Sequence, residues 1–288
     1  MALPLIKKQQ PKPKAQVEFS KGESLKLIQD YHTLNKKLEQ NARDDTINEQ
    51  ERTRNADRIR KEQHELGGIE KYQRASIYGA TSSKFVCAHW VEPLLKEHII
   101  VTKTKRPRIL DIGAIDNQYL QYDWFDTIPI DLNAQHKSVI QADFFDYAQN
   151  ALKERHEPFD AIVLSLVLNF QGDPRKRGDM LALAADTRLL RNGGLVFVAL
   201  PSASLDNSRY CDEDYLIKIC HVLGLKLVER KRSAKLALLA FQQEKEFEAY
   251  DVKTESFQYL EEISRGPAKK GEMRNNFAVM LKNSARCK

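Results

Sequence analysis

The sequence lacks any run of about 18 or more apolar residues, and this excludes a membrane-spanning helix. The stretch from Met1 to Lys8 contains too few consecutive apolar residues for a secretory signal peptide, so we expect no leader of that kind. The four cysteines form no C-x-x-C pair and show no metal-ligand spacing with the seven histidines. We therefore expect reduced thiols in the cytosol or nucleus, and no metal site.

Glycine is scarce where a dinucleotide-binding protein would need it, because the chain has no G-x-G-x-x-G signature. A single glycine, Gly113, follows the apolar run Arg108–Ile112. Such a run predicts the first strand of a parallel sheet, and a glycine after it lets backbone amides approach a ligand. On this stretch alone, a strand-to-loop turn that needs a positive φ explains the glycine equally well.

What the chain does have is enough apolar material for a core and a modest excess of basic residues. A length of 288 residues with 42% hydrophobic content allows one large domain, or a domain with an appendage. The net charge of +6 and the pI near 9.0 permit a polyanionic partner but do not require one.

Three regions of different composition follow one another. Residues 1–20 mix lysine with proline and predict a disordered basic tail, which is a phosphate-binding arm, a nuclear-import signal or only a solvated terminus. Residues 21–98 predict a helical N-terminal region, most of which we interpret as a lid or packing appendage without chemistry. Residues 99–288 alternate strand and helix signals and predict an α/β domain.

The helical region contains three expected helices. Ser20 or Ser24 caps the first, and a largely solvated helix over residues 44–65 ends at Gly67-Gly68. The third covers residues 84–95, where Pro93 predicts a kink or an early end.

The α/β domain predicts a parallel sheet with helices on both faces, because its strands are continuously apolar. Only a short helix fits between Gly113 and the second strand. The expected strands are 108–112, 127–131, 139–141, 159–165, 194–200, 226–229, 235–241 and 277–281, with helices at 178–190 and 212–223.

Polar residues follow these strands at their carboxyl ends, where parallel sheets bind ligands. Asp111 and Gly113 close the first strand, Ser165 closes the fourth, and Asp131 ends the second, where an acid can accept hydrogen bonds from a ribose diol. Asp143 follows the third strand and can accept from an adenine amine. Helix N-caps are the alternative for Asp131 and Asp143. The chain offers acids that can bind a ribose and an adenine, but it lacks the set of glycines that binds a pyrophosphate. This combination fits S-adenosylmethionine better than NAD.

Six motifs follow one another in the α/β domain. They are Leu110-Asp111-Ile112-Gly113-Ala114-Ile115-Asp116-Asn117, Ile130-Asp131-Leu132-Asn133, Gln141-Ala142-Asp143-Phe144, Leu164-Ser165-Leu166-Val167-Leu168-Asn169-Phe170, Arg177-Gly178-Asp179-Met180-Leu181 and Asn207-Ser208-Arg209-Tyr210. In this order they closely resemble the fungal nucleolar methyltransferases that modify an adenine N1 of large-subunit (25S) ribosomal RNA. The resemblance covers roughly residues 105–282.

This resemblance implies a Rossmann-like class I methyltransferase domain with a helical appendage. It also implies that the cofactor is S-adenosyl-L-methionine, held through Gly113 and Asp131. The implied partner is large-subunit ribosomal RNA or a pre-ribosomal particle, and the implied location is the nucleus, in the nucleolus. The same fold family includes an animal S-adenosylmethionine sensor that acts through protein partners, so a non-catalytic sensing module is the alternative. A methyltransferase for DNA or protein is a third reading.

Methyl transfer to adenine N1 depends on positioning rather than on a strong base, because N1 already carries a lone pair in the ring plane. Asn169 is our candidate catalytic residue for holding the Watson–Crick edge, and Phe170 for stacking on the base. The alternatives are a backbone turn at Asn169 and a core position for Phe170. Arg177, Arg209 and Tyr210 are candidate phosphate or base contacts, although a solvated charge explains a single arginine equally well.

Two basic clusters flank this site in sequence. One is the tail, and the other is C-terminal, consisting of Arg230-Lys231-Arg232, Lys269-Lys270 and Arg274. Lysines and arginines that neutralise phosphates supply affinity without sequence choice.

Deleting residues 1–20 is expected to make the salt dependence of RNA binding shallower, because this tail carries Lys7, Lys8, Lys12 and Lys14. For single strands, the slope of log K against log salt is about −0.7 for each phosphate neutralised. The measurement is the dissociation constant of the full-length and truncated proteins for a single-stranded RNA across a series of KCl concentrations. Equal slopes would show that the tail contacts no phosphate.

Overall fold

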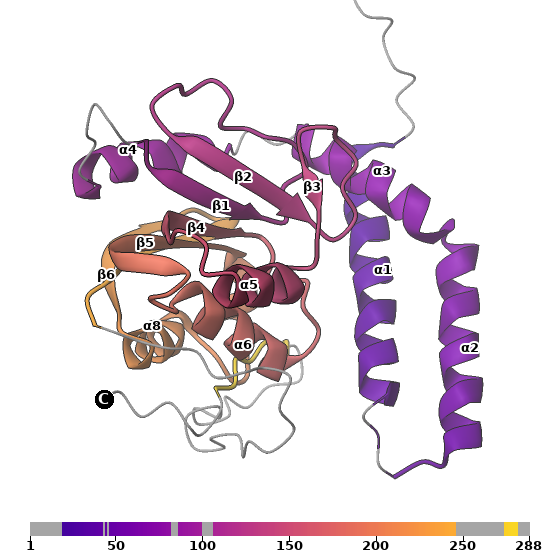
Figure 1. Cartoon of the computed structure of the whole chain (residues 1–288). Coiled ribbons are helices and arrows are strands. Elements are labelled where there is room, and N and C mark those ends of the chain that lie inside the picture. Colours follow the sequence, from indigo (N-terminus) through magenta and orange to yellow (C-terminus); the bar gives the residue numbers. More distant parts are fainter. Residues whose placement is uncertain are drawn as a thin grey trace, which may run out of the picture.

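Seven strands form one sheet in the order β3-β2-β1-β4-β5-β7-β6, in a computed structural model that describes residues 19–42, 44, 46–81, 86–99, 106–245 and 274–281 (Figure 1). The predicted first and fourth strands match β1 and β4 to the residue. The strands are β1 (Arg108–Ile112), β2 (Asp126–Asp131), β3 (Ile140–Gln141), β4 (Phe159–Ser165), β5 (Leu190–Pro201), β6 (Leu225–Arg232) and β7 (Leu236–Gln243).

Strand β7 runs antiparallel to both of its neighbours, β5 and β6, whereas the sequence predicted a parallel sheet. The reason is a tight turn at Ser233, whose N–H donates to the Leu236 carbonyl at 2.9 Å and whose hydroxyl accepts from the Leu236 N–H at 2.9 Å. A connection this short can join only antiparallel strands. The other strands, from β3 to β5, are parallel, and with helices on both faces they form the α/β sheet that the sequence predicted.

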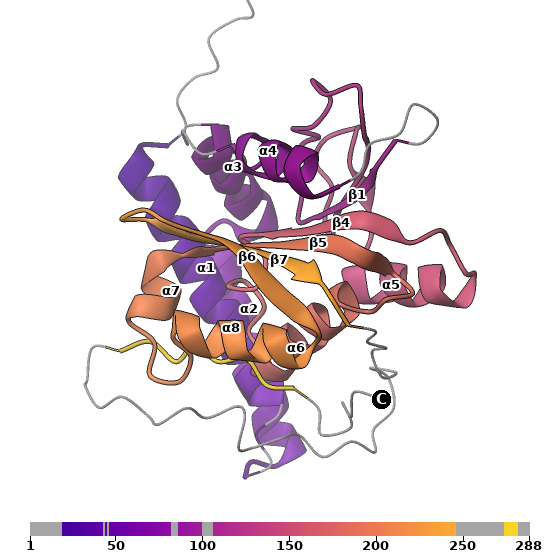
Figure 2. The same ribbon diagram turned by 90° about the vertical axis from the view of Figure 1, so that its left-hand side faces the viewer.

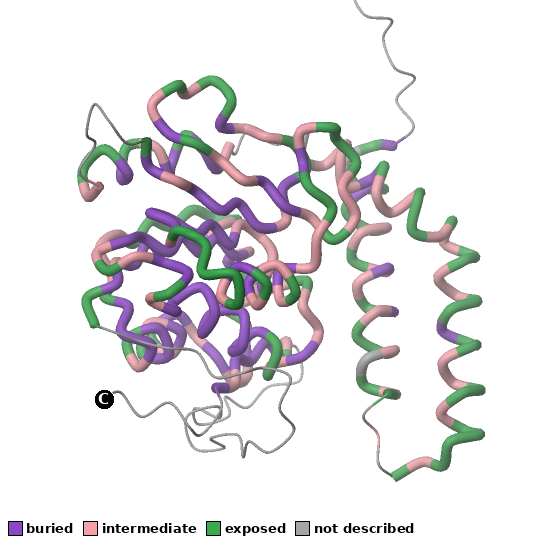
Figure 3. Tube along the Cα trace, in the orientation of Figure 1, coloured by how far each residue is buried: buried purple, intermediate pink, exposed green. Residues whose placement is uncertain are grey.

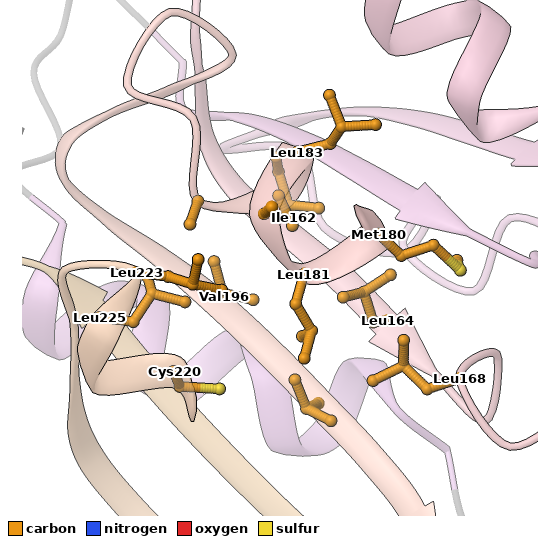
Figure 4. Close-up of a cluster of buried hydrophobic side chains, with 14 of the residues drawn as sticks. Ile162, Leu164, Leu168, Met180, Leu181, Leu183, Val196, Cys220, Leu223 and Leu225 are labelled. Atoms are coloured by element: carbon orange, nitrogen blue, oxygen red, sulfur yellow. The ribbon is translucent and has the colours of Figure 1, made fainter. Parts of the chain in front are cut away.

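Helices cover both faces of the sheet (Figures 1 and 2). One face carries α5 (Phe144–Lys153), α6 (Pro174–Ala184) and α8 (Glu213–Val222), the other carries α4 (Ala88–His98), and the short α7 (Ser202–Asp206) follows β5. Under α6, Ile162 and Val196 of the sheet pack with Leu181 in the larger core (Figure 4). On the other face, Trp90 of α4 meets Phe197 of β5 edge-on, with ring centroids 5.2 Å apart.

Helix α4 continues through Pro93 to His98, so the expectation of an early helix end at this proline was wrong. The predicted start of this helix at Lys84 and Phe85 lies outside the described residues. No helix forms between β1 and β2, where the sequence left room for a short one. Residues 117–125 form turns there, which bury Tyr119 and Phe125 against the face that α4 covers.

Helices α1 (Lys21–Ala42), α2 (Glu49–Glu65) and α3 (Gly68–Thr81) stand beside the sheet, at the end toward which the arrowheads of β1 and β2 point (Figure 1). Ser20, not Ser24, begins α1. Its hydroxyl accepts from the Glu23 N–H at 3.2 Å, and the Glu23 carboxylate accepts from the Ser20 N–H at 2.8 Å. The hairpin of α1 and α2 is largely exposed (Figure 3).

Helix α3 was not predicted. Gly67-Gly68 was interpreted as a stop, but only Leu66 and Gly67, the latter with φ of +101°, separate the two helices, and α3 begins at Gly68. Backbone conformation at the second glycine decides between a loop and a new helix, and the residue type is compatible with both.

The C-terminal segment 274–281 is not the strand that the sequence predicted. Its apolar residues Phe277, Val279 and Leu281 are buried, but its backbone bonds to the segment after α7 at Asn275 and to the start of α6 instead of to a strand. The Met280 N–H donates to the Pro174 carbonyl at 2.9 Å. The continuous apolar run at 277–281 therefore predicted burial correctly and strand pairing wrongly.

Gly178→Ala is expected to destabilise the fold by roughly 1–3 kcal/mol, because a methyl group at this helical glycine would overlap the Met280 carbonyl oxygen. The matched control is Gly22→Ala in α1, where a methyl group meets nothing within 4 Å and is expected to stabilise by about 0.5–1 kcal/mol. Urea unfolding of both variants is the measurement. Equal stability of Gly178→Ala and wild type would contradict the packing of the C-terminal segment on α6.

Candidate functional site

Three of the predicted ligand-binding residues lie side by side where the parallel strands end. The last residue of β1, Ile112, pairs with the penultimate residues of β2 and β4. Gly113, Asp131 and Ser165 come next on these three strands, so they share the carboxyl edge of the sheet. Strand β3 extends the same edge, because Gln141 pairs with Asp131.

Gly113 occupies a position that no other residue fits without strain. Its φ is +78°, and its N–H donates to the Ile130 carbonyl at 2.8 Å. A Cβ here would lie 2.5 Å from Cγ2 of Val167, in the loop after β4. The glycine therefore serves both the backbone turn and the close approach of two strand ends. Contact with a ligand remains a prediction for this residue.

Asp111 points into a buried polar cluster. Its side chain is buried, and Oδ2 has no hydrogen-bond partner among the described residues. Burial raises the pKa of Asp111 to about 8, and the neighbouring Asp116 adds to the rise. Burial likewise raises the pKa of the Cys87 thiol to about 12, with Asp111 adding to the rise and Ser165 opposing it. Tyr119 completes the cluster, and burial together with the neighbouring Cys87 and Asp111 raises the pKa of its hydroxyl.

The two remaining acids behave differently from each other. Oδ1 of Asp131 accepts from the Asn133 N–H at 2.7 Å within a turn, and burial raises the pKa of this carboxyl. No helix follows Asp131 in this described stretch, so the helix-cap alternative is wrong for it. Asp143 does cap helix α5, because its Oδ1 accepts from the Phe145 N–H at 2.7 Å. Its contact with an adenine amine remains a prediction.

The chain turns sharply after β4 and brings Asn169 and Phe170 to the same edge. Leu166 has a φ of +59°, which is uncommon for a residue with a side chain. The Phe170 N–H then donates to the Val167 carbonyl at 2.9 Å and closes the turn. The sequence alternative of a backbone turn at Asn169 is therefore correct, and it does not compete with a role for the side chain.

Arg177 holds this turn from beneath. Its guanidinium is buried, and Nε donates to the carbonyls of Leu168 at 3.0 Å and Gln171 at 2.8 Å. Nη1 donates to the Ala278 carbonyl at 2.7 Å, and the cation lies 4.5 Å from the ring centroid of Phe277. The expectation that Arg177 contacts phosphate or base is wrong, because its side chain is enclosed and bound to backbone carbonyls.

The side chains of Asn169 and Phe170 lie in different environments within this turn. Oδ1 of Asn169 is buried and has no hydrogen-bond partner among the described residues. Phe170 is 41% exposed, so its alternative assignment to the core is wrong. One face of the Phe170 ring stacks on His32 of α1, with centroids 4.0 Å apart and the planes inclined by 13°.

The sequence analysis missed His32 and Tyr72 as parts of the site. The Tyr72 hydroxyl lies 3.1 Å from Nε2 of His32, and the Tyr72 ring stacks on Tyr31 with centroids 4.6 Å apart. Burial lowers the pKa of His32 to about 4, and the charge of Lys36 adds to this. The available signal was a group of aromatic residues in a region otherwise dominated by charge.

The C-terminal basic cluster is partly neutralised. Arg232 pairs with Glu213 at 3.0 Å and with Asp206, and Arg230 also pairs with Glu213. The other members at Lys269-Lys270, and residues 1–18 of the predicted tail, lie outside the described residues, whereas Phe19 is buried and Ser20 caps α1. Arg209 and Tyr210 follow α7, where the Arg209 N–H donates to the Asn275 carbonyl at 2.9 Å, and their contacts with RNA remain predictions.

Residues 57–279 match the model of a protein family described as 25S rRNA (adenine(2142)-N(1))-methyltransferase, Bmt2. The chain belongs to this Bmt2 family. The 25S rRNA (adenine(2142)-N(1))-methyltransferase of Saccharomyces cerevisiae is 29% identical over 223 residues, which cover 76% of this chain and 61% of that protein. The 25S rRNA adenine-N(1) methyltransferase of Schizosaccharomyces pombe is 30% identical over 190 residues, which cover 62% of this chain and 67% of that protein.

The chain therefore spans about 61% of the length of its Saccharomyces relative in the Bmt2 family. Among solved structures, DhpI in complex with SAH has a TM-score of 0.40 at 14% identity, covering 60% of this chain and 94% of that chain. Aeropyrum pernix fibrillarin with natively bound S-adenosyl-L-methionine has a TM-score of 0.34 at 17% identity, covering 53% of this chain and 74% of that chain.

The part of the chain that the structure describes contains neither a candidate metal site nor a candidate membrane-spanning helix. No three His, Cys, Asp or Glu side chains gather there in a way that could hold a metal ion. No described helix is both long and apolar enough to cross a membrane.

Asp111→Asn is expected to stabilise the protein at pH 9 by roughly 1–3 kcal/mol relative to wild type, and much less at pH 5. The folded pKa of about 8 lies above the ordinary value of 3.8, so the folded state holds the proton more tightly between these two values. Wild-type stability therefore falls as the pH rises through this window, and the amide removes that fall. Urea unfolding at pH 5, 7 and 9 measures it, with the exposed Asp123→Asn as control. A parallel response of wild type and Asp111→Asn to pH would contradict the burial of an uncompensated carboxyl.

Proposed function

We propose that this protein is an S-adenosyl-L-methionine-dependent methyltransferase that modifies N1 of an adenine in large-subunit ribosomal RNA. Membership of the Bmt2 family and the names of both relatives support this. The observation that carries the proposal is the turn after β4. It presents an unpartnered amide oxygen on Asn169 and an open ring on Phe170, beside the edge that carries Gly113 and Asp131.

The strand ends fit S-adenosyl-L-methionine, which supplies a methyl group on a cationic sulfur. Gly113 turns the backbone at the end of β1 with a positive φ and without a side chain, and Asp131 keeps one carboxylate oxygen for the ribose after its bond to Asn133. The unpartnered Oδ2 of Asp111 suits the ammonium of the methionine part, because a carboxylate beside a cation no longer bears an uncompensated charge. Asp143 and Ser165 would line the same edge.

The turn fits an adenine better than a target that must first lose a proton. Asn169 can accept a hydrogen bond from the exocyclic amine through its unpartnered Oδ1, and Phe170 offers a stacking surface. Residues 165–170 contain no carboxylate or histidine. His32 lies against Phe170, but its pKa of about 4 makes it a poor proton acceptor near neutral pH. The role of these groups is therefore to orient the base and exclude water.

The partner that follows from this function is the large-subunit RNA, free or within a pre-ribosomal particle, and the expected location is the nucleolus. The net charge of +6 is compatible with a polyanionic partner. Because an extruded base is read by stacking and by its Watson–Crick edge, specificity for the target depends on the shape of the RNA around it.

Three substitutions are expected to separate cofactor binding from catalysis. Asp131→Ala should weaken S-adenosyl-L-methionine binding, since it removes the ribose acceptor. Asn169→Ala should lower turnover roughly 10- to 100-fold, if the lost hydrogen bond is worth about 1.4–2.8 kcal/mol, while cofactor affinity stays near wild type. Phe170→Ala should weaken RNA binding and turnover together, by about 1–3 kcal/mol of stacking. Asn150→Ala, on the exposed side of α5, is the matched control.

Calorimetry measures cofactor binding, and mass spectrometry of nucleosides identifies the product in large-subunit RNA that lacks the modification. The expected product is 1-methyladenosine, which also stops reverse transcription at the modified position. Methylation at N6 or on the ribose would refute the positioning mechanism. Cofactor binding without methylation of any RNA or particle would instead support a sensing module.

A further inference from the structure

Phe170 is held on one face and open on the other. The His32 ring covers one face at a centroid distance of 4.0 Å and nearly parallel, yet Phe170 remains 41% exposed. Its backbone is fixed separately, because the carbonyls of Leu168 and Gln171 are bound by Arg177. The orientation of the ring itself thus depends on the N-terminal helix α1.

His32 is in turn fixed by a second helix of the N-terminal region. Tyr72 of α3 meets the His32 ring edge-on at 5.1 Å and 87°, and its hydroxyl lies 3.1 Å from Nε2. The Tyr72 ring in turn stacks on Tyr31 of α1, with centroids 4.6 Å apart. A row of rings therefore runs from the core of the helical region to the turn after β4.

The chemistry of His32 suits a supporting role and not a proton-transfer role. Nε2 is engaged by the Tyr72 hydroxyl, and Nδ1 is buried without a partner among the described residues. A buried imidazole beside the cationic Lys36 is neutral near pH 7. It presents a flat, uncharged face to Phe170, which is the geometry of an offset or stacked aromatic pair.

We propose that His32 is a positioning residue for the target base: it supports the rear face of Phe170, so that an adenine stacks on the open face. This rests on the function proposed above. It makes helices α1 and α3 a wall of the active site, and the base completes a stack of three rings that begins at His32. Because the ring is oriented before the base binds, binding costs less conformational entropy.

A double-mutant cycle between His32 and Phe170 tests this directly. His32→Ala should lower kcat/KM for unmodified large-subunit RNA about 2- to 10-fold, the worth of one aromatic pair, with unchanged affinity for S-adenosyl-L-methionine. In a Phe170→Ala background the same substitution should have no further effect, because the ring that it supports is gone. His32→Phe keeps the stack and should stay within about twofold of wild type. Thr33→Ala, on the exposed side of α1, is the control.

Two results would overturn the assignment: an equal loss from His32→Ala with and without Phe170, or a His32→Phe variant as impaired as His32→Ala. If His32→Ala does not fold, Tyr72→Phe replaces it, since that change removes only the hydroxyl beside Nε2. The loss of kcat/KM caused by Tyr72→Phe should again vanish in the Phe170→Ala background. An additive loss in that background would also overturn the assignment. A wild-type protein that methylates no RNA would refute the proposed function, whereas an active protein with an additive cycle would refute only the role of His32.

Discussion

A buried guanidinium, that of Arg177, ties three distant parts of the chain into one site. It binds the carbonyls on either side of Asn169 and Phe170, and it binds Ala278 in the C-terminal segment. A buried charge is costly unless it is fully hydrogen-bonded, and here backbone carbonyls and the Phe277 ring surround it. The turn that we assign to the target base is therefore held by groups that do not contact the base.

The neighbouring polar groups follow the opposite logic. Asp111 and Asn169 each have a buried oxygen without a partner, and each such group costs the folded state roughly 1–3 kcal/mol. Asp111 lies near the carboxyl end of β1, and Asn169 lies in the turn after β4, so both are near the edge where parallel sheets bind ligands. The packing of the surrounding core offsets the free-energy cost of these unpaired oxygens. A ligand that donates hydrogen bonds to them would remove that cost.

Local sequence pattern was sufficient for the first and fourth strands of the sheet. The strands at 108–112 and 159–165 and the glycine after the first one follow from apolar runs and from the need for a positive φ. Long-range partners were not predictable in the same way. The burial of Arg177 depends on its bond to Ala278, 101 residues further along the chain. The direction of β7 depends on the turn at Ser233, and the position of segment 274–281 depends on its contact with α6.

The N-terminal helices show the same limit. Their sequence is so rich in charge that a solvated appendage was the natural interpretation, and α3 was missed at two consecutive glycines. Nothing local distinguishes His32 from a surface histidine, because its partners Tyr72 and Phe170 lie far along the chain. The strand pattern and the family resemblance predicted the residues at the sheet edge, while the contacts of the helical region emerged only in three dimensions.

The most direct test of this account is a crystal structure of the protein with S-adenosylhomocysteine and an adenosine-containing RNA fragment. We predict that the ribose hydroxyls lie within hydrogen-bond distance of Asp131, and that the adenine stacks on the face of Phe170 opposite His32. Its N1 should point toward the cofactor sulfur, with the exocyclic amine donating to Oδ1 of Asn169. A cofactor bound away from the carboxyl ends of β1 and β2, or an adenine held without Asn169 and Phe170, would contradict it.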